Sequence, residues 1–445
     1  MPLKKAPCWH KNGRKPYWLL FLTLLLLCMC SCARKNVVTV NKDVPPALAS
    51  RQLPEDQLLN VAIKVFDPGS LPEDKDERMG LSEEIRQAEA VFYAVHLKDT
   101  LQHSGFWGSV WVVPQGQVME DLVVSGRIEY SDGEKLVLYI HAEDATGRTW
   151  IDRTYEETST KQEREKAKIE KQDAFQDLFN AISNDLVKFR NSLNSQQLVA
   201  IHNTSEMRFA ASMAKEPFSH YLLKDSKGRY HLAAFPAEND QMLKRVRLIR
   251  ARDEMLMDVL TSYYDGYYTR LWSPYHNWRK FRSEELETIR EIKNRALATQ
   301  VMGFAAIVGS VLLGTVGGDD TYRAVAPIRE ILAAGGVAAI YSGHQMRKDA
   351  KMNEEAIKEL GESLSSDARP LLVQIKGDTL RLTGTAKEQY AKWRRLLSDI
   401  YSQESEPNRE LPEIIGPETE PLPERITEAV SNSKNQDKKT ANTSR

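Results

Sequence analysis

Cysteine is scarce in this chain and confined to its beginning. The 445 residues include four cysteines, and none follows Cys32. The chain after Cys32 therefore offers no intramolecular disulfide, no thiolate metal ligand and no cysteine nucleophile. It also lacks the motifs G-x-x-x-x-G-K-[ST], G-x-G-x-x-G after a strand, H-E-x-x-H and G-x-S-x-G. We therefore predict no catalytic residue, no metal site and no enzyme activity.

An excess of charge of either sign is also missing. The sequence has 61 lysines and arginines against 62 aspartates and glutamates, for a formal net charge of −1. Such a balance gives no electrostatic footprint for nucleic acid, which we exclude as a partner. The nine histidines are scattered without the paired spacing of metal ligands. His141 alternates with Val137 and Tyr139, which indicates a strand residue with a structural role.

The first residues have the layout of a secretory leader, and we assign residues 1–31 to a signal peptide. An apolar run extends from Tyr17 to Met29, and the small residue Ser31 lies just before Cys32. The run of about 13 residues would form a helix of roughly 20 Å, shorter than a hydrocarbon core of about 30 Å. A retained signal anchor is the alternative. The basic residues before the run are Lys4, Lys5, Lys11, Arg14 and Lys15.

The residues Met29-Cys30-Ser31-Cys32 resemble the lipobox of bacterial lipoproteins. The resemblance implies cleavage between Ser31 and Cys32 and acylation of Cys32, so a covalent lipid on Cys32 is the only cofactor-like group that we expect. Several acyl chains would then hold the protein stably on membrane lipid. In enterobacterial lipoproteins an aspartate after the cysteine favours inner-membrane retention. Ala33 stands there, so the resemblance favours the periplasmic face of the outer membrane.

Two segments have the composition of unstructured chain. Residues 32–56, which begin with the lipidated cysteine, are polar and contain prolines, and we interpret them as a tether. Residues 402–445 are rich in Pro, Glu, Ser, Asn and Lys and have few large apolar groups. Such a composition cannot bury enough apolar surface to offset the entropy of ordering, so we predict a disordered tail.

Residues 57–157 predict a small α/β domain. Residues 59–65 alternate as one strand, and Ser82 caps a helix that Gly105 ends. Strands follow at 109–114, 122–130 and 136–140, the last two joined by a turn at 131–134. The expected order is β-α-β-β-β. A second turn, Asp144-Ala145-Thr146-Gly147, then leads to Thr149–Tyr155.

The successive segments LLNVAIKVF, GFWGSVWVVP, DLVVSGRIEY and HAEDATGRTW resemble the small α/β domain of periplasmic envelope proteins. Examples are the N-terminal domain of the Tol–Pal system's propeller protein and the curli-secretion channel lipoproteins. Auxiliary lipoproteins of lipid-trafficking transporters have a similar layout. These relatives bind partners or assemble rather than catalyse, so the resemblance implies a binding role for residues 57–157.

Residues 158–295 change to a helical period and predict a helical domain with an inserted hairpin at 220–236. A long helix starts near Asp240, and its aromatics recur at helical spacing. One interpretation is a surface that stacks on glycan or lies at a membrane interface. The other, which we favour, is a buried aromatic core with hydroxyls at its edge, and Pro274 is expected to break the helix. The candidate surface residues are Tyr264, Tyr268, Trp272 and Tyr275.

Residues 296–345 resemble a glycine-zipper hairpin, a feature of some outer-membrane lipoproteins. Residues 296–318 carry no charge, and small residues recur every fourth position in two limbs. Insertion into a membrane, a buried soluble hairpin and a self-assembly seam are all open, because the second limb is short and begins after Arg329 and Glu330. The small-residue stripe consists of Ala306, Ser310, Gly314, Gly318, Ala334, Ala338 and Ser342.

Residues 346–401 predict a small α-β-β-α unit. An amphipathic helix at 351–364 precedes a hairpin at 371–384, and a final helix covers 387–401. The run, including the LTG after its second strand, faintly resembles the BON domains of envelope proteins. The whole chain is therefore expected to be α+β: a β-α-β-β-β domain, a mainly helical region with a glycine-rich helical hairpin, and this C-terminal unit.

These features together predict a lipid-anchored periplasmic scaffold or assembly protein of the outer membrane. Its expected partners are membrane lipid, through the acyl chains, and an envelope protein of unknown identity, with a homo-oligomer as a further option. An alternative is an accessory lipoprotein of a transport or secretion complex, which could form a ring. A remote alternative is an enzyme that acts on envelope glycans through carboxylates near the aromatic segment.

Overall fold

The structure is a computed structural model of the 445-residue chain. It describes residues 36–40, 43–73, 81–164, 172–237, 239–312, 352, 355–360, 371–375, 378–404 and 418–419. For residues 289, 292, 293, 295–312, 371–375, 378–380, 403, 404, 418 and 419 it describes the backbone alone. The contacts divide the chain after Asn36, and every element below belongs to the unit Val37–Arg445.

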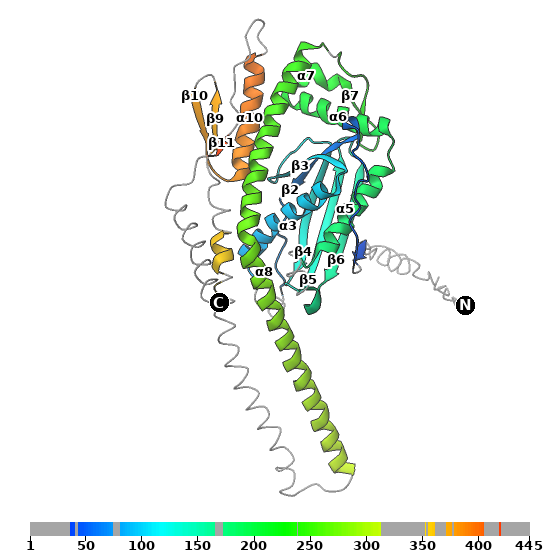
Figure 1. Cartoon of the computed structure of the whole chain (residues 1–445), viewed down its shortest axis with the longest axis vertical. Helices are drawn as coiled ribbons and strands as arrows, with labels where there is room; N and C mark the ends of the chain where they lie inside the picture. The colour runs from blue at the N-terminus through cyan, green and yellow to red at the C-terminus, as the bar shows by residue number, and fades with distance from the viewer. Residues whose placement is uncertain are drawn as a thin grey trace, which may run out of the picture. The chain divides into compact units, whose positions relative to one another are not determined.

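The largest sheet has six strands in the order β1-β6-β5-β4-β2-β3 (Figure 1). It is mixed: β2 runs parallel to both β3 and β4, β4-β5-β6 form an antiparallel meander, and β1 runs parallel to β6. With the surrounding helices, this sheet confirms the expected α+β class. The strands are β1 (Val37–Thr39), β2 (Leu59–Lys64), β3 (Trp107–Val113), β4 (Leu122–Ser131), β5 (Lys135–Asp144) and β6 (Thr149–Thr158).

The crossover from β2 to β3 is helix α3 (Glu83–Ser104), which begins and ends as the sequence predicts. The Ser82 side chain accepts a hydrogen bond from the Ile85 amide at 3.3 Å, and Glu83 and Glu84 lie in the first turn. Gly105 ends the helix with a φ of 72°, a left-handed conformation that costs little without a Cβ. After α3 the order is β3-β4-β5-β6, one strand longer than β-α-β-β-β, because the segment after the second turn is a full strand.

Further helices pack around the sheet. Helix α5 (Gln176–Asn191) contacts β6 and α3, and α6 (Ser195–Met213) begins with an Asn194–Gln197 capping box. A short helix α7 (Lys215–Phe218) and the η2 turn (Ser219–Tyr221) precede the predicted small hairpin. Its strands are β7 (Leu222–Lys224) and β8 (Tyr230–Leu232), and they are followed by α8 (Gln241–Leu312).

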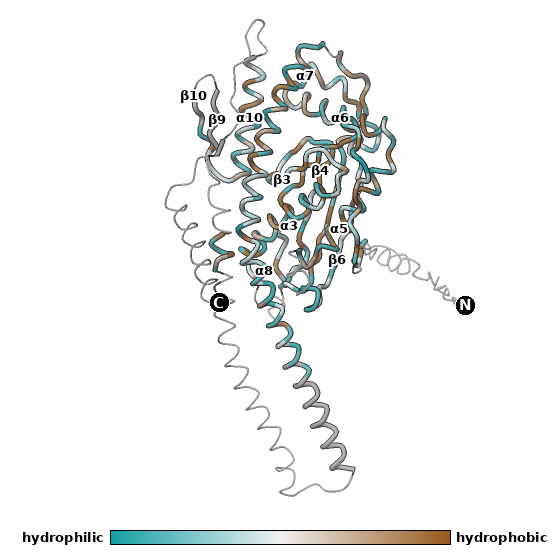
Figure 2. Tube along the Cα trace, viewed as in Figure 1, coloured by the Kyte–Doolittle hydropathy of each residue, from teal (hydrophilic) through white to brown (hydrophobic). Residues whose placement is uncertain are grey.

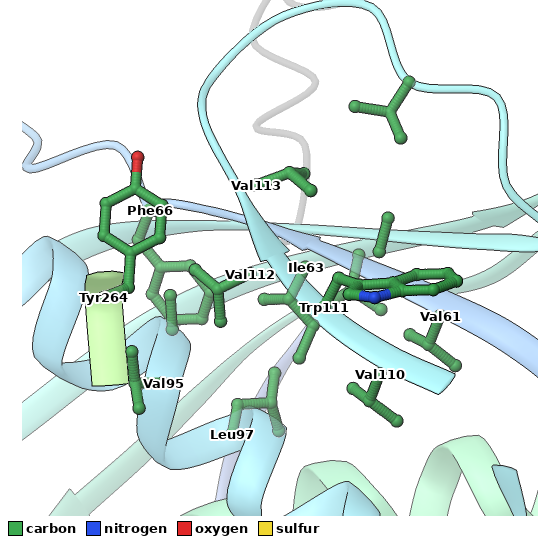
Figure 3. Packing of buried hydrophobic residues seen from close by; sticks show 14 of the residues in the cluster. Val61, Ile63, Phe66, Val95, Leu97, Val110, Trp111, Val112, Val113 and Tyr264 are labelled. Carbon is green, nitrogen blue, oxygen red and sulfur yellow. The ribbon is translucent and has the colours of Figure 1, made fainter. Parts of the chain in front are cut away.

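One hydrophobic core joins the sheet to these helices. Figure 3 shows valines of β2 and β3 packed with Val95 and Leu97 of α3, and Tyr264 of α8 belongs to the same cluster as Phe66. The same cluster continues through α5 and α6. Figure 2 shows hydrophobic residues concentrated on the strands and α3, whereas the turns of α8 that follow Trp278 are mostly hydrophilic. Between Glu284 and Asn294 no residue with a described side chain is buried.

Much of the predicted tether is part of the fold. Val37–Thr39 is the edge strand β1, and the Val40 amide donates to the Glu156 carbonyl at 2.8 Å. Beyond it, side chains of α5 hold the backbone: Asp177 accepts from the amide of Val44 at 3.0 Å, and Asn184 accepts from the amide of Ala47 at 2.7 Å. The short 3-10 helix η1 (Glu55–Gln57) then leads into β2. The tether prediction is wrong for residues 37–40 and 43–56, because long-range hydrogen bonds order a segment of polar composition.

Pro274 lies inside α8 and does not break it, contrary to expectation. A proline in a helix interior removes one backbone hydrogen bond and costs about 3 kcal/mol or more. Apolar residues on both sides of it, Leu271, Tyr275 and Trp278, are buried in the core and hold the helix in place. Tertiary packing therefore outweighs the local preference. The helix that was expected to run from about Asp240 towards Trp272 continues to Leu312.

The C-terminal part forms a second, smaller sheet and helix α10. Strands β9 (Leu371–Ile375) and β10 (Asp378–Leu382) are antiparallel, and residues 355–360 are helical, as predicted. Helix α10 (Ala386–Glu404) packs against α8. Of the predicted tail 402–445, residues 402–404 end α10, and β11 (Glu418–Thr419) pairs with β9 rather than being disordered. The remainder of that prediction lies outside the described residues.

Candidate functional site

Most sites predicted from the sequence lie outside the described residues. These include the cleavage and acylation residues Ser31 and Cys32. Of the small-residue stripe, Ala306 and Ser310 lie on α8, where the backbone alone is described, and the helix there agrees with a helical first limb. The stripe residues outside the described part are Gly314, Gly318, Ala334, Ala338 and Ser342.

The aromatic residues of α8 pack against α3. Tyr264 is 3% exposed and Tyr275 is fully buried, while Tyr268 and Trp272 are half-buried. Phe92 of α3 lies at the centre of the group, with ring centroids 4.6 Å from Tyr268, 4.7 Å from Tyr275 and 5.9 Å from Trp272. Tyr264 and Tyr275 are thus core residues, and the four rings do not form one exposed stacking surface.

A buried polar network lies behind these rings. Glu89 Oε1 on α3 accepts hydrogen bonds from Ser131 Oγ at 2.6 Å and from the Tyr275 hydroxyl at 2.7 Å. The hydroxyls of Tyr93 and Tyr275 are 2.6 Å apart. Burial raises the pKa of Glu89, although Arg86 and the hydroxyl donors oppose the shift. All these groups are enclosed, so the network fixes α8 on α3 and offers no surface to a ligand.

A second buried cluster fixes the segment before α5. Asp173 accepts from Arg279 Nη1 at 2.7 Å and lies 3.4 Å from His276 Nε2. Burial alone would raise the pKa of Asp173, but Arg279 and the histidines His96 and His276 hold it well below its usual range. His96 is itself buried, which lowers its pKa. This ion pair is also inward-facing, and we assign it a structural role.

The face of the sheet opposite α3 and α5 is polar and partly exposed. The register places Ser125 of β4 opposite His141 of β5, and His141 opposite Asp152 of β6. Most of the polar groups on this face pair with one another. The Tyr139 hydroxyl donates to Asp152 at 2.6 Å, and Arg127 Nη2 lies 3.1 Å from Glu129 Oε1. We call this surface the open face.

A pocket of about 430 Å³ lies at one end of the open face. Its floor comes from the strands, with Lys64 at the end of β2, and one wall comes from the loop between β3 and β4. Helix α6 contributes Arg208 to another wall. The lining residues are Lys64, Gly116, Gln117, Val118, Glu120, Val123, Ser125, His141, Glu143, Asp144 and Arg208.

The charged groups of the pocket differ in their pKa shifts and in their hydrogen-bond partners. Burial lowers the pKa of the half-buried Lys64, although Glu143 opposes the shift. Burial raises the pKa of Glu120 to about 8, against the effect of Arg250, whose Nη2 donates to Glu120 at 3.0 Å. Arg208 Nη1 donates to the Ala145 carbonyl at 2.8 Å. The pocket thus presents two cations, Lys64 and Arg208, beside carboxylates, a combination that suits a polar ligand.

Sequence reasoning missed this pocket, although part of the signal was present. Alternation in β4 and β5 places Ser125, His141 and Glu143 on one face, and Lys64 follows an apolar strand. The alternation of His141 with Val137 and Tyr139 predicts a structural role, whereas the structure places His141 in the pocket lining, with its Nε2 3.8 Å from Glu143 Oε2. Two features of the pocket depend on long-range contacts: β2 pairs with β4, and α6 contributes Arg208. Local sequence patterns cannot predict such contacts.

Two features are absent from the described part of the chain, a cluster of metal ligands and a helix that could cross a membrane. Among these residues no group of three or more His, Cys, Asp or Glu side chains is placed to hold a metal ion. No helix within the described ranges has the length and hydropathy that a membrane crossing requires. Comparison of the sequence and the structure with protein-family models, curated proteins and solved structures finds no match.

Proposed function

We propose that this chain is a lipid-anchored periplasmic scaffold or assembly protein of the bacterial outer membrane that performs no catalysis. The observation that carries the proposal is the position of Cys32, the last cysteine of the chain, directly after a leader-like segment and five residues before β1. Five residues of extended chain span at most roughly 17 Å. An acyl anchor on Cys32 would therefore keep the folded part close to the membrane surface.

The open face supports a binding role. One side of the sheet is covered by helices, whereas the other presents half-buried and exposed polar groups such as Arg127, Tyr139 and Asp152. An interface rich in Tyr and Arg suits a protein partner. The proposed kinship of residues 57–157 with small periplasmic α/β domains is supported by the order of strands and helix alone.

Acylation of Cys32 is tested by metabolic labelling with radioactive palmitate and by fractionation. We expect the wild-type chain to incorporate label and to sediment with the outer membrane, and Cys32→Ser to remain unlabelled. Cys30→Ser is the matched control and is expected to keep the label. An unlabelled wild-type chain, or a labelled Cys32→Ser chain, would contradict the proposal.

The same variant tests whether residues 296–345 insert into the membrane, one of the three interpretations of the glycine-rich hairpin. If the glycine-rich hairpin inserts into the membrane, Cys32→Ser will stay in the membrane fraction through a carbonate wash. Complete release of Cys32→Ser would exclude insertion and leave the acyl chains as the attachment. This outcome is independent of the palmitate result, so the two attachments are separable.

A further inference from the structure

The pocket on the open face contains a lysine amino group that makes no direct contact with a counter-charge among the described residues, although the charge of Glu143 acts on it from longer range. Lys64 is half-buried, and it forms no hydrogen bond or ion pair with any residue that the structure describes. Other cations on the same sheet are paired: Lys135 Nζ lies 3.0 Å from Glu156, and Arg127 Nη2 lies 3.1 Å from Glu129. Burial of a cation costs free energy, and the charge of Glu143 offsets that cost only in part, because the pKa of Lys64 stays below its ordinary value. Lys64 is therefore suited to receive an anion.

A second cation of the pocket is held in a fixed position. The guanidinium of Arg208 donates to the Ala145 carbonyl at 2.8 Å and lies 4.6 Å from the centroid of the Tyr230 ring. The carbonyl and the ring together restrict its rotamers, which reduces the entropy that ligand binding would cost. Its remaining N–H groups are donors for a carboxylate. The pocket therefore combines two cations, one of which, Arg208, is held in place by other parts of the fold.

Of the three carboxylates in the lining, Glu143 accepts no hydrogen bond from a described side chain. Asp144 is occupied, because its oxygens accept from Trp150 Nε1 at 2.8 Å and from the amide of Thr146 at 2.8 Å. Glu120 is bound by Arg250 at 3.0 Å. Glu143 is half-buried, and its nearest ion-pair partner, His141, is 3.8 Å away. An N–H donor on a ligand would therefore meet Glu143.

We propose that this pocket binds the free carboxylate end of a short peptide or amino acid, with the carboxylate at Lys64 and Arg208 and an amino or amide N–H at Glu143. Its volume of about 430 Å³ lies in the range of about 300–1,000 Å³ that is typical of small-ligand sites. A dianionic phosphate is a poorer ligand, because Glu143 and Asp144 would repel its second charge. The site is distinct from the lipid anchor, so it can fail without affecting the proposed function.

The test uses the detergent-solubilised full chain and an equimolar pool of free dipeptides at millimolar concentration. Lysines are labelled near neutral pH with an amine-selective reagent kept in large excess over all amines, those of the peptides included, and mass spectrometry follows the rate at each site. We expect the pool to slow labelling of Lys64 several-fold and to leave Lys135 unaffected. A pool of the same dipeptides as C-terminal amides, and inorganic phosphate, are expected to give no protection.

Variants test the assigned contacts by calorimetry with the same pool. We expect Lys64→Met to weaken binding about tenfold or more, as befits the loss of a charge-assisted hydrogen bond. Lys135→Met, a lysine of the same sheet outside the pocket, is expected to bind like the wild type. Equal protection by amides or phosphate, no protection by the free pool, or unchanged binding by Lys64→Met would each overturn the proposal.

Discussion

At the scale of single residues, two tyrosines of α8 differ in what surrounds their hydroxyls. Tyr267 and Tyr275 are both fully buried. Tyr275 donates to Glu89 at 2.7 Å and lies 2.6 Å from the Tyr93 hydroxyl, whereas the Tyr267 hydroxyl has no hydrogen-bond partner among the described residues. Removing one partner of a buried hydrogen bond lowers stability by about 1–3 kcal/mol, because the other partner is left unsatisfied. Removing a buried hydroxyl that has no partner leaves no other group unsatisfied.

We therefore expect Tyr275→Phe to lower the free energy of unfolding by about 1–3 kcal/mol. Tyr267→Phe, the same substitution two turns earlier, is expected to be neutral or stabilising. Urea denaturation of both variants beside the wild type checks this difference. Equal losses for the two variants would show that ring packing, rather than the hydroxyl network, decides the contribution of these tyrosines.

At the scale of elements, α8 closes an exposed sheet edge. Strand β3 lies at the end of the sheet, where its backbone groups would be unpaired. The Thr261 hydroxyl of α8 accepts from the Val112 amide at 3.1 Å and donates to the Val112 carbonyl at 3.3 Å. Nearby, Trp111 Nε1 donates to Asp258 at 2.7 Å. A helix side chain thus takes the place of a neighbouring strand.

We expect Thr261→Val to lower the free energy of unfolding by about 1–3 kcal/mol, because it keeps the shape but leaves two buried backbone groups of Val112 unpaired. Hydrogen exchange should also become faster at the Val112 amide. Thr269→Val is the matched control, since the Thr269 hydroxyl is exposed and donates only to the Asp265 carbonyl in its own helix. Unchanged exchange at Val112 would contradict this account of the edge.

The elements that the sequence predicts correctly are those with local signals. Ser82 and Gly105 bound α3, and the turn after β4 forms where Asp132 accepts from the Lys135 amide at 2.8 Å and Gly133 takes a φ of 91°. Segments stabilised from a distance escape such patterns. The segment around Val44 is ordered by a hydrogen bond to Asp177 of α5, which is distant in the sequence. The pocket was missed for the same reason, because its walls meet only in the folded chain.

At the scale of the whole molecule, one buried charge cluster joins segments that are distant in the sequence. Arg250 of α8 donates to Glu120 at 3.0 Å, to Ser205 of α6 at 3.1 Å and to Glu254 at 3.2 Å. Next to it, Arg394 of α10 donates to Asp253 at 2.7 Å. The cluster therefore connects the loop before β4 with three helices, and its protonation state affects how firmly they are held.

Glu120 determines whether the free energy of unfolding rises or falls with pH in this cluster. Burial raises its pKa from the ordinary 4.5 to about 8 in the folded state, so the folded state binds more protons than the unfolded state between these values. Stability from this group is fully present below about pH 4.5 and is lost as the pH rises to about 8. Burial also raises the pKa of Asp253 and of Glu254, which act in the same direction. Asp121 has the opposite effect on the pH dependence of stability. Burial alone would raise its pKa, but His202 and Arg250 lower it.

Glu120→Gln mimics the protonated carboxyl and should flatten this dependence. We expect the variant to match the wild type in urea denaturation near pH 5 and to lose less stability towards pH 8, by on the order of a few kcal/mol. The comparison isolates Glu120 because Glu157, whose pKa burial also raises to about 8, remains in both proteins. Glu55→Gln, at an exposed position in η1, is the control and should follow the wild-type curve. Parallel curves for wild type and Glu120→Gln would mean that Glu120 is ionised throughout this range, so that its ion pair with Arg250 outweighs the cost of burial.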